Sequence, residues 1–171
     1  MAPVALVRDQ SYLEHDPGEG HPEKPDRLRV IYRAVDELLE KTPESFVDIP
    51  AGEATREQLL RVHAEGHVER LEAMAGESGF LDLDTRTSPG SYRAALRAAG
   101  GVCAAADAVV ERRVSRAFAL VRPPGHHAEM DTAMGFCLFN NIAVAADYAR
   151  AELGLERVLI ADWDLHHGNG T

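Results

Sequence analysis

Arg157-Val-Leu-Ile-Ala161 runs without a break into Asp162-Trp-Asp164-Leu-His166, and this stretch decides the fold class. Its apolar residues follow one another without polar alternation, which is typical of a strand buried on both faces of a parallel sheet. Charged side chains begin where the apolar run ends. In open parallel sheets, ligands gather outside the carboxyl ends of the strands. The stretch therefore predicts a buried strand with a site at its end.

The rest of the chain alternates short apolar runs with longer helical patterns. Further strands are predicted at 4–7 and, fully buried, at 117–121; helices are predicted at 26–41, from 55 through 62, at 89–111 with a Thr87-Ser88-Pro89 start, and at 140–152 before Gly154. Thr55 can cap its helix while Gln58 reaches back to it. This alternation predicts an α/β fold, a parallel sheet flanked by helices. No helix follows the last strand to cross back over the sheet, so we expect an incomplete sheet.

Composition excludes several classes of protein. The 18 Lys and Arg residues are outnumbered by 28 Asp and Glu residues, and the net charge of −10 disfavours a nucleic-acid partner. No apolar run reaches the roughly 20 residues that a membrane-spanning helix needs. The two cysteines form no paired framework, and the N-terminus has no leader-like pattern, so a cytoplasmic location is expected.

The polar stretch after the last predicted strand has the donor types of a metal site. In an extended segment, Asp162, Asp164 and His166 project to the same side. A catalytic zinc site usually takes three protein ligands from His, Asp or Glu and leaves a fourth position for water. Asp164 and His166 would supply two of them. The alternative is that an Asp and a His after a strand merely cap a turn.

A second cluster, Arg122-Pro-Pro-Gly-His126-His127-Ala128, follows the strand predicted at 117–121. Two adjacent histidines can accept, donate or hold a proton, so acid–base chemistry is the natural interpretation. The alternative is a loop pair that binds solvent or backbone groups. Both clusters should meet at one edge of the sheet.

Four blocks together resemble the signature motifs of histone deacetylases and acetylpolyamine amidohydrolases: 21–28, 122–128, 135–141 and 162–171. The resemblance implies an arginase-like α/β fold, with residues 1–171 as the N-terminal part of a single deacetylase domain. It also implies that a third, carboxylate ligand of the zinc and a tyrosine or histidine electrophile lie downstream of residue 171. We therefore expect the 171 residues alone to be inactive and poorly stable.

The resemblance assigns roles to the histidine pair. It implies that His126 and His127 are catalytic, with Asp162 as the partner of His126 and Asn169 as the partner of His127. A neutral amide leaves an imidazole less basic than a carboxylate does. We therefore expect His127 to be the general base and His126 the electrostatic helper.

Further roles follow from the same resemblance. Asp164 and His166 match zinc ligands, and together with Asp162 they resemble a structural potassium site. Gly135 and Phe136 resemble the wall of a substrate tunnel. Arg27 resembles an arginine beside an internal acetate channel, its alternative being an exposed charge at a helix start, and His21 would buttress that loop.

Three other residues with metal-binding or nucleophilic side chains are given structural interpretations. His63 and His67 have the spacing of one helix face, but no further ligand lies near them in the sequence. Cys137 is interpreted as a packed thiol.

The predicted function is a zinc-dependent deacetylase that hydrolyses the acetamide of an acetyl-lysine protein or an acetylpolyamine. The alternative is a non-catalytic acyl-lysine or metal-binding module. An arginase-like dimanganese hydrolase is disfavoured by the 122–128 and 135–141 blocks. A homo-oligomer is possible.

Overall fold

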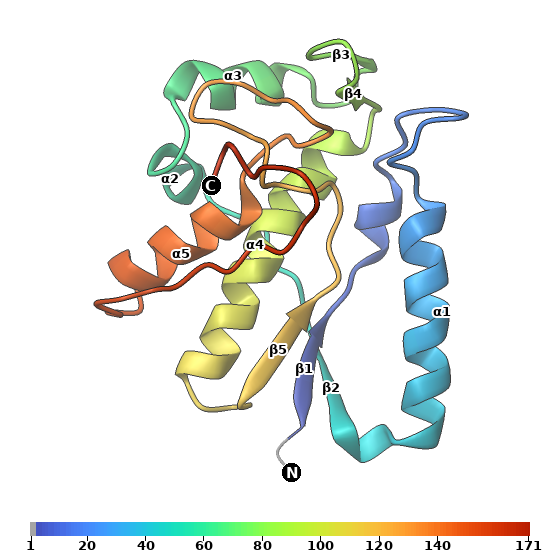
Figure 1. Ribbon diagram of the computed structural model, residues 1–171, viewed down its shortest axis with the longest axis vertical. Coiled ribbons are helices and arrows are strands. Elements are labelled where there is room, and N and C mark those ends of the chain that lie inside the picture. The colour runs from blue at the N-terminus through green and yellow to red at the C-terminus, as the bar shows by residue number, and fades with distance from the viewer. Residues whose placement is uncertain (1–2) are drawn as a thin grey trace.

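The computed structural model describes residues 3–171, and its centre is a three-stranded parallel sheet (Figure 1). The strands β1 (Val4–Val7), β2 (Phe46–Ile49) and β5 (Arg116–Ala119) lie in the order β2-β1-β5. Val4 pairs with Phe46 on one side and Arg116 on the other. The predicted α/β fold with a parallel sheet is confirmed.

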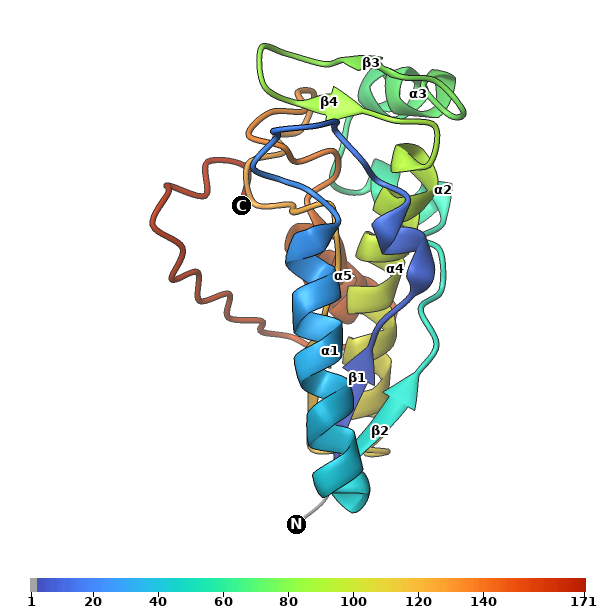
Figure 2. The same ribbon diagram turned by 90° about the vertical axis from the view of Figure 1, so that its right-hand side faces the viewer.

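Helices cover both sides of this sheet, with α1 on one side and α4 on the other (Figures 1 and 2). The remaining elements are 3-10 helices η1 (Gln10–Leu13) and η2 (Pro43–Ser45), helices α1 (Asp26–Lys41), α2 (Arg56–Leu60), α3 (Glu65–Ala73), α4 (Ser91–Val110) and α5 (Asn141–Ala151), and the antiparallel strands β3 (Gly79–Phe80) and β4 (Arg86–Thr87). Alanine and glycine fill the buried face of α4, which allows the sheet and α5 to approach it closely. No helix among residues 3–171 is long and apolar enough to cross a membrane.

The helix ends follow the local signals in two cases. Thr55 caps α2 through a complete capping box with Gln58, and the Asn140 side chain accepts from the Ala143 N–H at the start of α5. Gly154, with φ of +72°, follows α5 as a left-handed residue. The sequence therefore predicts these ends because each depends on residues three or four positions apart.

Two helix predictions are wrong in their bounds. The helix predicted from Thr55 ends at Leu60, because Ala64 adopts an extended backbone and donates its N–H to Met130 O, so His67 lies in the separate helix α3. The proline-started helix begins at Ser91 instead. There the Ser91 hydroxyl accepts from the Ser88 N–H, which holds the preceding loop rather than capping a helix at Ser88.

The two strands predicted to be fully buried are also corrected. The strand at 117–121 is β5, four residues from Arg116 to Ala119, and Phe118 on it is 58% exposed. Residues 157–161 form no strand, and Leu159 is 92% exposed. The sheet ends at β5, and residues 157–161 do not pair with its free edge, so side chains such as Leu159 stay exposed. Figure 2 shows the C-terminal segment after α5 extending away from the body and returning to the loops above the sheet.

Candidate active site

The two polar clusters meet beyond the carboxyl end of β5. The chain leaves β5 into the loop that carries His126 and His127, and the segment 162–171 folds back onto this loop. Gly170 donates its N–H to His126 O at 2.9 Å, and an added Cβ at Gly170 would collide with the Ala128 backbone. The close approach therefore requires glycine at this position.

His126 is paired with Asp162. Its Nδ1 lies 2.8 Å from Asp162 Oδ2, and Gly168 lies so close that a Cβ there would press on both side chains. Hydrogen bonding from the Asp164 N–H, and then from His126, lowers the pKa of Asp162. Asp162 therefore stays a carboxylate that can hold the His126 ring in one orientation.

His127 is paired with Asn169. Its Nδ1 lies 2.6 Å from Asn169 Oδ1, and its ring centroid lies 4.1 Å from that of His126. Gly135, with φ of +56°, faces the His127 ring so closely that a Cβ would collide with it. The structure thus brings the two histidines, their partners and Gly135 together.

Asp164 and His166 contact each other on the exposed part of the segment. Asp164 Oδ1 accepts from the His166 N–H at 2.8 Å and lies 3.0 Å from His166 Nδ1. These two contacts, the backbone one first, lower the pKa of Asp164. The His166 ring centroid lies 5.9 Å from that of His127, so the pair adjoins the tandem histidines.

The donor set fits zinc in kind but not in number. A carboxylate and an imidazole are ordinary zinc ligands, and three protein ligands are the usual count. Within residues 3–171, no group of three or more His, Cys, Asp or Glu side chains is arranged to hold a metal ion. The assignment of Asp164 and His166 as zinc ligands therefore stays a prediction.

The predicted tunnel residue Phe136 contacts His21 and Thr85. It has φ of +68°, an uncommon conformation for a side chain of this size, and its N–H donates to Thr85 Oγ1 at 3.0 Å. Its ring meets His21 edge to face, with the centroids 4.8 Å apart. His21 in turn contacts Asp84 O through Nε2, so it supports the loop between β3 and β4 that contains Asp84. The substrate role of Phe136 stays a prediction.

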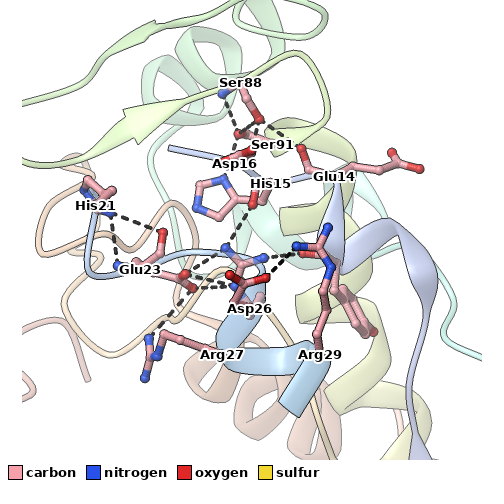
Figure 3. Close-up of polar contacts among 12 residues, drawn as sticks. Glu14, His15, Asp16, His21, Glu23, Asp26, Arg27, Arg29, Ser88 and Ser91 are labelled. Carbon is pink, nitrogen blue, oxygen red and sulfur yellow. Dashed lines mark hydrogen bonds and ion pairs between the residues drawn. The ribbon is translucent and has the colours of Figure 1, made fainter. Parts of the chain in front are cut away.

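Arg27 lies at the start of α1 with its side chain 58% exposed, 4.0 Å from Glu23 (Figure 3). Its predicted place beside an internal channel stays a prediction. The buried cation nearby is Arg122, which makes three hydrogen bonds to the Glu23 carboxylate and donates to Tyr12 O and His15 O. The side chains of Glu23 and Arg122 are 0% and 5% exposed.

The sequence analysis missed this Glu23–Arg122 pair. Both residues lie inside conspicuous blocks, at 21–28 and 122–128, which was a usable signal. A buried charged side chain needs a partner of opposite charge. The 122–128 block contains the cation Arg122, and the 21–28 block contains the carboxylate Glu23.

His63, His67 and Cys137 are all buried. His63 Nδ1 lies 2.9 Å from Glu129 O and its Nε2 accepts from the Asn140 N–H, while His67 Nε2 contacts Leu138 O. Burial lowers the pKa of His63 to about 4 and raises that of the Cys137 thiol to about 12. These groups are neutral packing residues near neutral pH, as their structural interpretation requires.

Comparisons with known proteins bear on the family and the fold. Residues 21–171 match the family model of the histone deacetylase domain. The crystal structure of the HDA15 HD domain superposes with a TM-score of 0.92 at 41% identity, covering 99% of this chain and 49% of that one. This similarity confirms the predicted deacetylase-like fold.

Curated relatives show the same relationship. Histone deacetylase 5 of Arabidopsis thaliana is 41% identical, and a probable deacetylase of Methanothermobacter thermautotrophicus is 44% identical, each over 98% of this chain. A histone deacetylase-like amidohydrolase of Pseudomonas aeruginosa is 44% identical over 89% of it. The chain spans 27%, 49% and 40% of the lengths of these three relatives, respectively. The chain belongs to the histone deacetylase family of hydrolases.

Proposed function

We propose that this chain supplies the tandem-histidine half of a zinc-dependent deacetylase site, which hydrolyses the acetamide of an acetyl-lysine protein or an acetylpolyamine. One observation carries the proposal: His126 and His127 lie side by side, each with its Nδ1 against its own partner, Asp162 or Asn169. Such partners fix the tautomer and orientation of an imidazole that works in proton transfer.

The two partners differ in charge, and this difference divides the roles. Asp162 is a carboxylate that orients the His126 ring, which would stabilise an oxyanion on the substrate by hydrogen bonding. Asn169 offers a neutral amide oxygen, so His127 can hold a proton on Nδ1 and keep a free electron pair on Nε2. His127 would accept a proton from the attacking water at that atom.

Zinc enters the proposal through Asp164 and His166. These two side chains would hold the ion together with a ligand from outside residues 3–171. A bound zinc ion would polarise the acetamide carbonyl and acidify a water molecule. The names of the relatives support deacetylation, and the tandem histidines support hydrolysis by activated water. A non-catalytic module would not need a pair of histidines oriented for proton transfer.

The deciding experiment compares His166→Ala with His167→Ala in the full-length protein. We expect His166→Ala to lose both stoichiometric zinc and turnover of an acetyl-lysine peptide and an acetylpolyamine, because the remaining ligands hold a catalytic metal poorly. His167 is exposed and has no part in the proposed site, which makes it the matched control. Full zinc content and full turnover in His166→Ala would contradict the zinc assignment. Zinc binding without any amide hydrolysis by the unaltered protein would instead favour the metal-binding module.

A further inference from the structure

We propose that Glu129 is a positioning residue that sets the orientation of the Asn169 amide and, through it, the tautomer of His127. The catalytic consequence rests on the proposed function, because it matters only if His127 works as the base. The hydrogen-bond arrangement itself does not depend on that function.

The Asn169 amide nitrogen is surrounded by acceptors. Asn169 Nδ2 donates to Glu129 Oε1 at 2.7 Å and lies 3.4 Å from both His127 O and Met134 Sδ. An ionised carboxylate can only accept hydrogen bonds. Glu129 therefore requires Nδ2, and not Oδ1, on its own side of the amide.

The opposite end of the amide then faces the histidine. Asn169 Oδ1 lies 2.6 Å from His127 Nδ1, and a carbonyl oxygen can only accept, so the proton belongs on Nδ1. The Nε2 atom is left as the acceptor. A reversed amide would present an N–H to Nδ1, place the ring proton on Nε2 and remove the atom that accepts a proton in catalysis. An aspartate at this position would not need orienting, because its two oxygens are equivalent.

Glu129 is itself held firmly. Its carbonyl accepts from Nδ1 of His63, which is 2% exposed, and its N–H donates to Thr132 O at 2.9 Å. His63 Nε2 accepts from the Asn140 N–H at 3.0 Å. A buried neutral histidine therefore fixes the backbone of Glu129, whose side chain fixes Asn169. This contact also gives His63 a purpose beyond filling the core.

The first test reads the tautomer directly. In the full-length protein with 15N-labelled histidine, the His127 ring signals are assigned by their loss in His127→Gln. We expect the unaltered protein and Glu129→Gln to show the Nδ1–H form, because a glutamine Oε1 can still accept from Asn169. Glu129→Met keeps the length of the side chain without an acceptor of comparable strength, and we expect it to show a mixture of the two tautomers.

The second test uses Asn169→Asp to reverse the sign of the Glu129 effect. With Asn169 present, Glu129→Met should lower kcat about 10- to 100-fold with little change in KM, the usual loss for a residue that orients a catalytic group. With Asn169→Asp, Glu129 faces a second carboxylate and repels it. The Asn169→Asp/Glu129→Gln double variant should therefore have a higher kcat than Asn169→Asp alone.

Two outcomes would overturn the proposal: a pure Nδ1–H signal with unchanged kcat in Glu129→Met, or an Asn169→Asp/Glu129→Gln variant no better than Asn169→Asp. The proposed function fails differently, through absent deacetylation or an active His127→Ala variant. The tautomer measurement keeps its meaning in that case, because it needs no turnover. Glu129→Gln, which keeps an acceptor for Asn169, serves as the folded control for Glu129→Met.

Discussion

Glu23–Arg122 and Asp164–His166 each pair an acidic with a basic side chain, but the two pairs differ in burial and in sequence separation. The first joins side chains that are 0% and 5% exposed, and Arg122 also donates to two backbone carbonyls. The second joins side chains that are 50% and 70% exposed and only two residues apart. The buried pair ties three separate segments together, whereas the exposed pair ties a segment to itself.

The difference separates support from reactivity. Because Glu23 and Arg122 are almost fully buried and are hydrogen-bonded to protein groups, removing either partner carries a large free-energy cost. Asp164 and His166 keep access to solvent and can exchange their mutual contact for another ligand. We therefore expect variants of the buried pair to lose stability, and variants of the exposed side to lose activity while remaining folded.

The largest effect on activity should come from the tandem histidines, which adjoin the exposed Asp164–His166 pair. His127→Ala in the full-length protein is expected to lower kcat by about 10²–10⁴-fold, the usual contribution of a general base, with KM and the denaturation midpoint nearly unchanged. Steady-state kinetics and chemical denaturation check this. If His126→Ala lowers kcat clearly more than His127→Ala does, the division of roles between the two histidines is wrong.

The buried pair gives the next largest effect. Arg122→Met leaves the Glu23 carboxylate buried without its cation and should lower the free energy of unfolding by about 3–5 kcal/mol. Arg27→Met is the matched control: its guanidinium is 58% exposed and 4.0 Å from the same carboxylate, so its loss should cost less than about 1 kcal/mol. Equal losses in the two variants would erase the contrast between buried and exposed pairs.

Acid should weaken the buried region. Burial first, and then the charge of Arg122, lower the pKa of His15 to about 3, and burial lowers that of His63 to about 4. The unfolded chain binds these protons near pH 6.5 and the folded chain does not, so folding stability rises with pH between about 4 and 6.5. Each histidine should contribute up to about 1.4 kcal/mol per pH unit in that window. Denaturation midpoints of the His63→Gln variant should show a shallower pH dependence than those of the unaltered protein.

The smallest effect on stability should come from Asp164→Asn. Within residues 3–171 the Asp164 side chain hydrogen-bonds to His166, two residues away, and it is half exposed, so the denaturation midpoint should not change. Zinc content should fall in the same sample. A clear shift of the midpoint would mean that Asp164 supports the fold, contrary to the comparison made above.

Residues whose structure depends on near neighbours were predictable from the sequence. The apolar spacing that predicts α1, the Thr55 capping box and the helical pattern of α5 before Gly154 all involve side chains a few positions apart. The meeting of the 122–128 and 162–171 segments was also predictable, because parallel strands and their loops share one edge. In the structure the second segment reaches this edge without the strand that was expected to carry it.

The remaining features depend on contacts between distant segments. The structural role of Glu23 depends on its contact with Arg122, and that of Glu129 depends on its contact with Asn169. Neither contact is indicated by the residues that surround Glu23 or Glu129 in the sequence. Leu159 was expected to be buried because apolar runs are usually buried, but burial of a strand requires a neighbour that the pattern does not specify. Phe136 has a left-handed backbone that no residue preference indicates.

The order β2-β1-β5 has a consequence for synthesis of the chain. The central strand β1 leaves the ribosome first, yet one of its two edges stays unpaired until Arg116–Ala119 has been made. Pairing between segments so far apart in sequence is slow, because the ends of a long loop must first be brought together. During that interval the edge of β1 that later pairs with β5 is open to other partners, which exposes Ala5, Leu6 and Val7 to misassociation until β5 has been made.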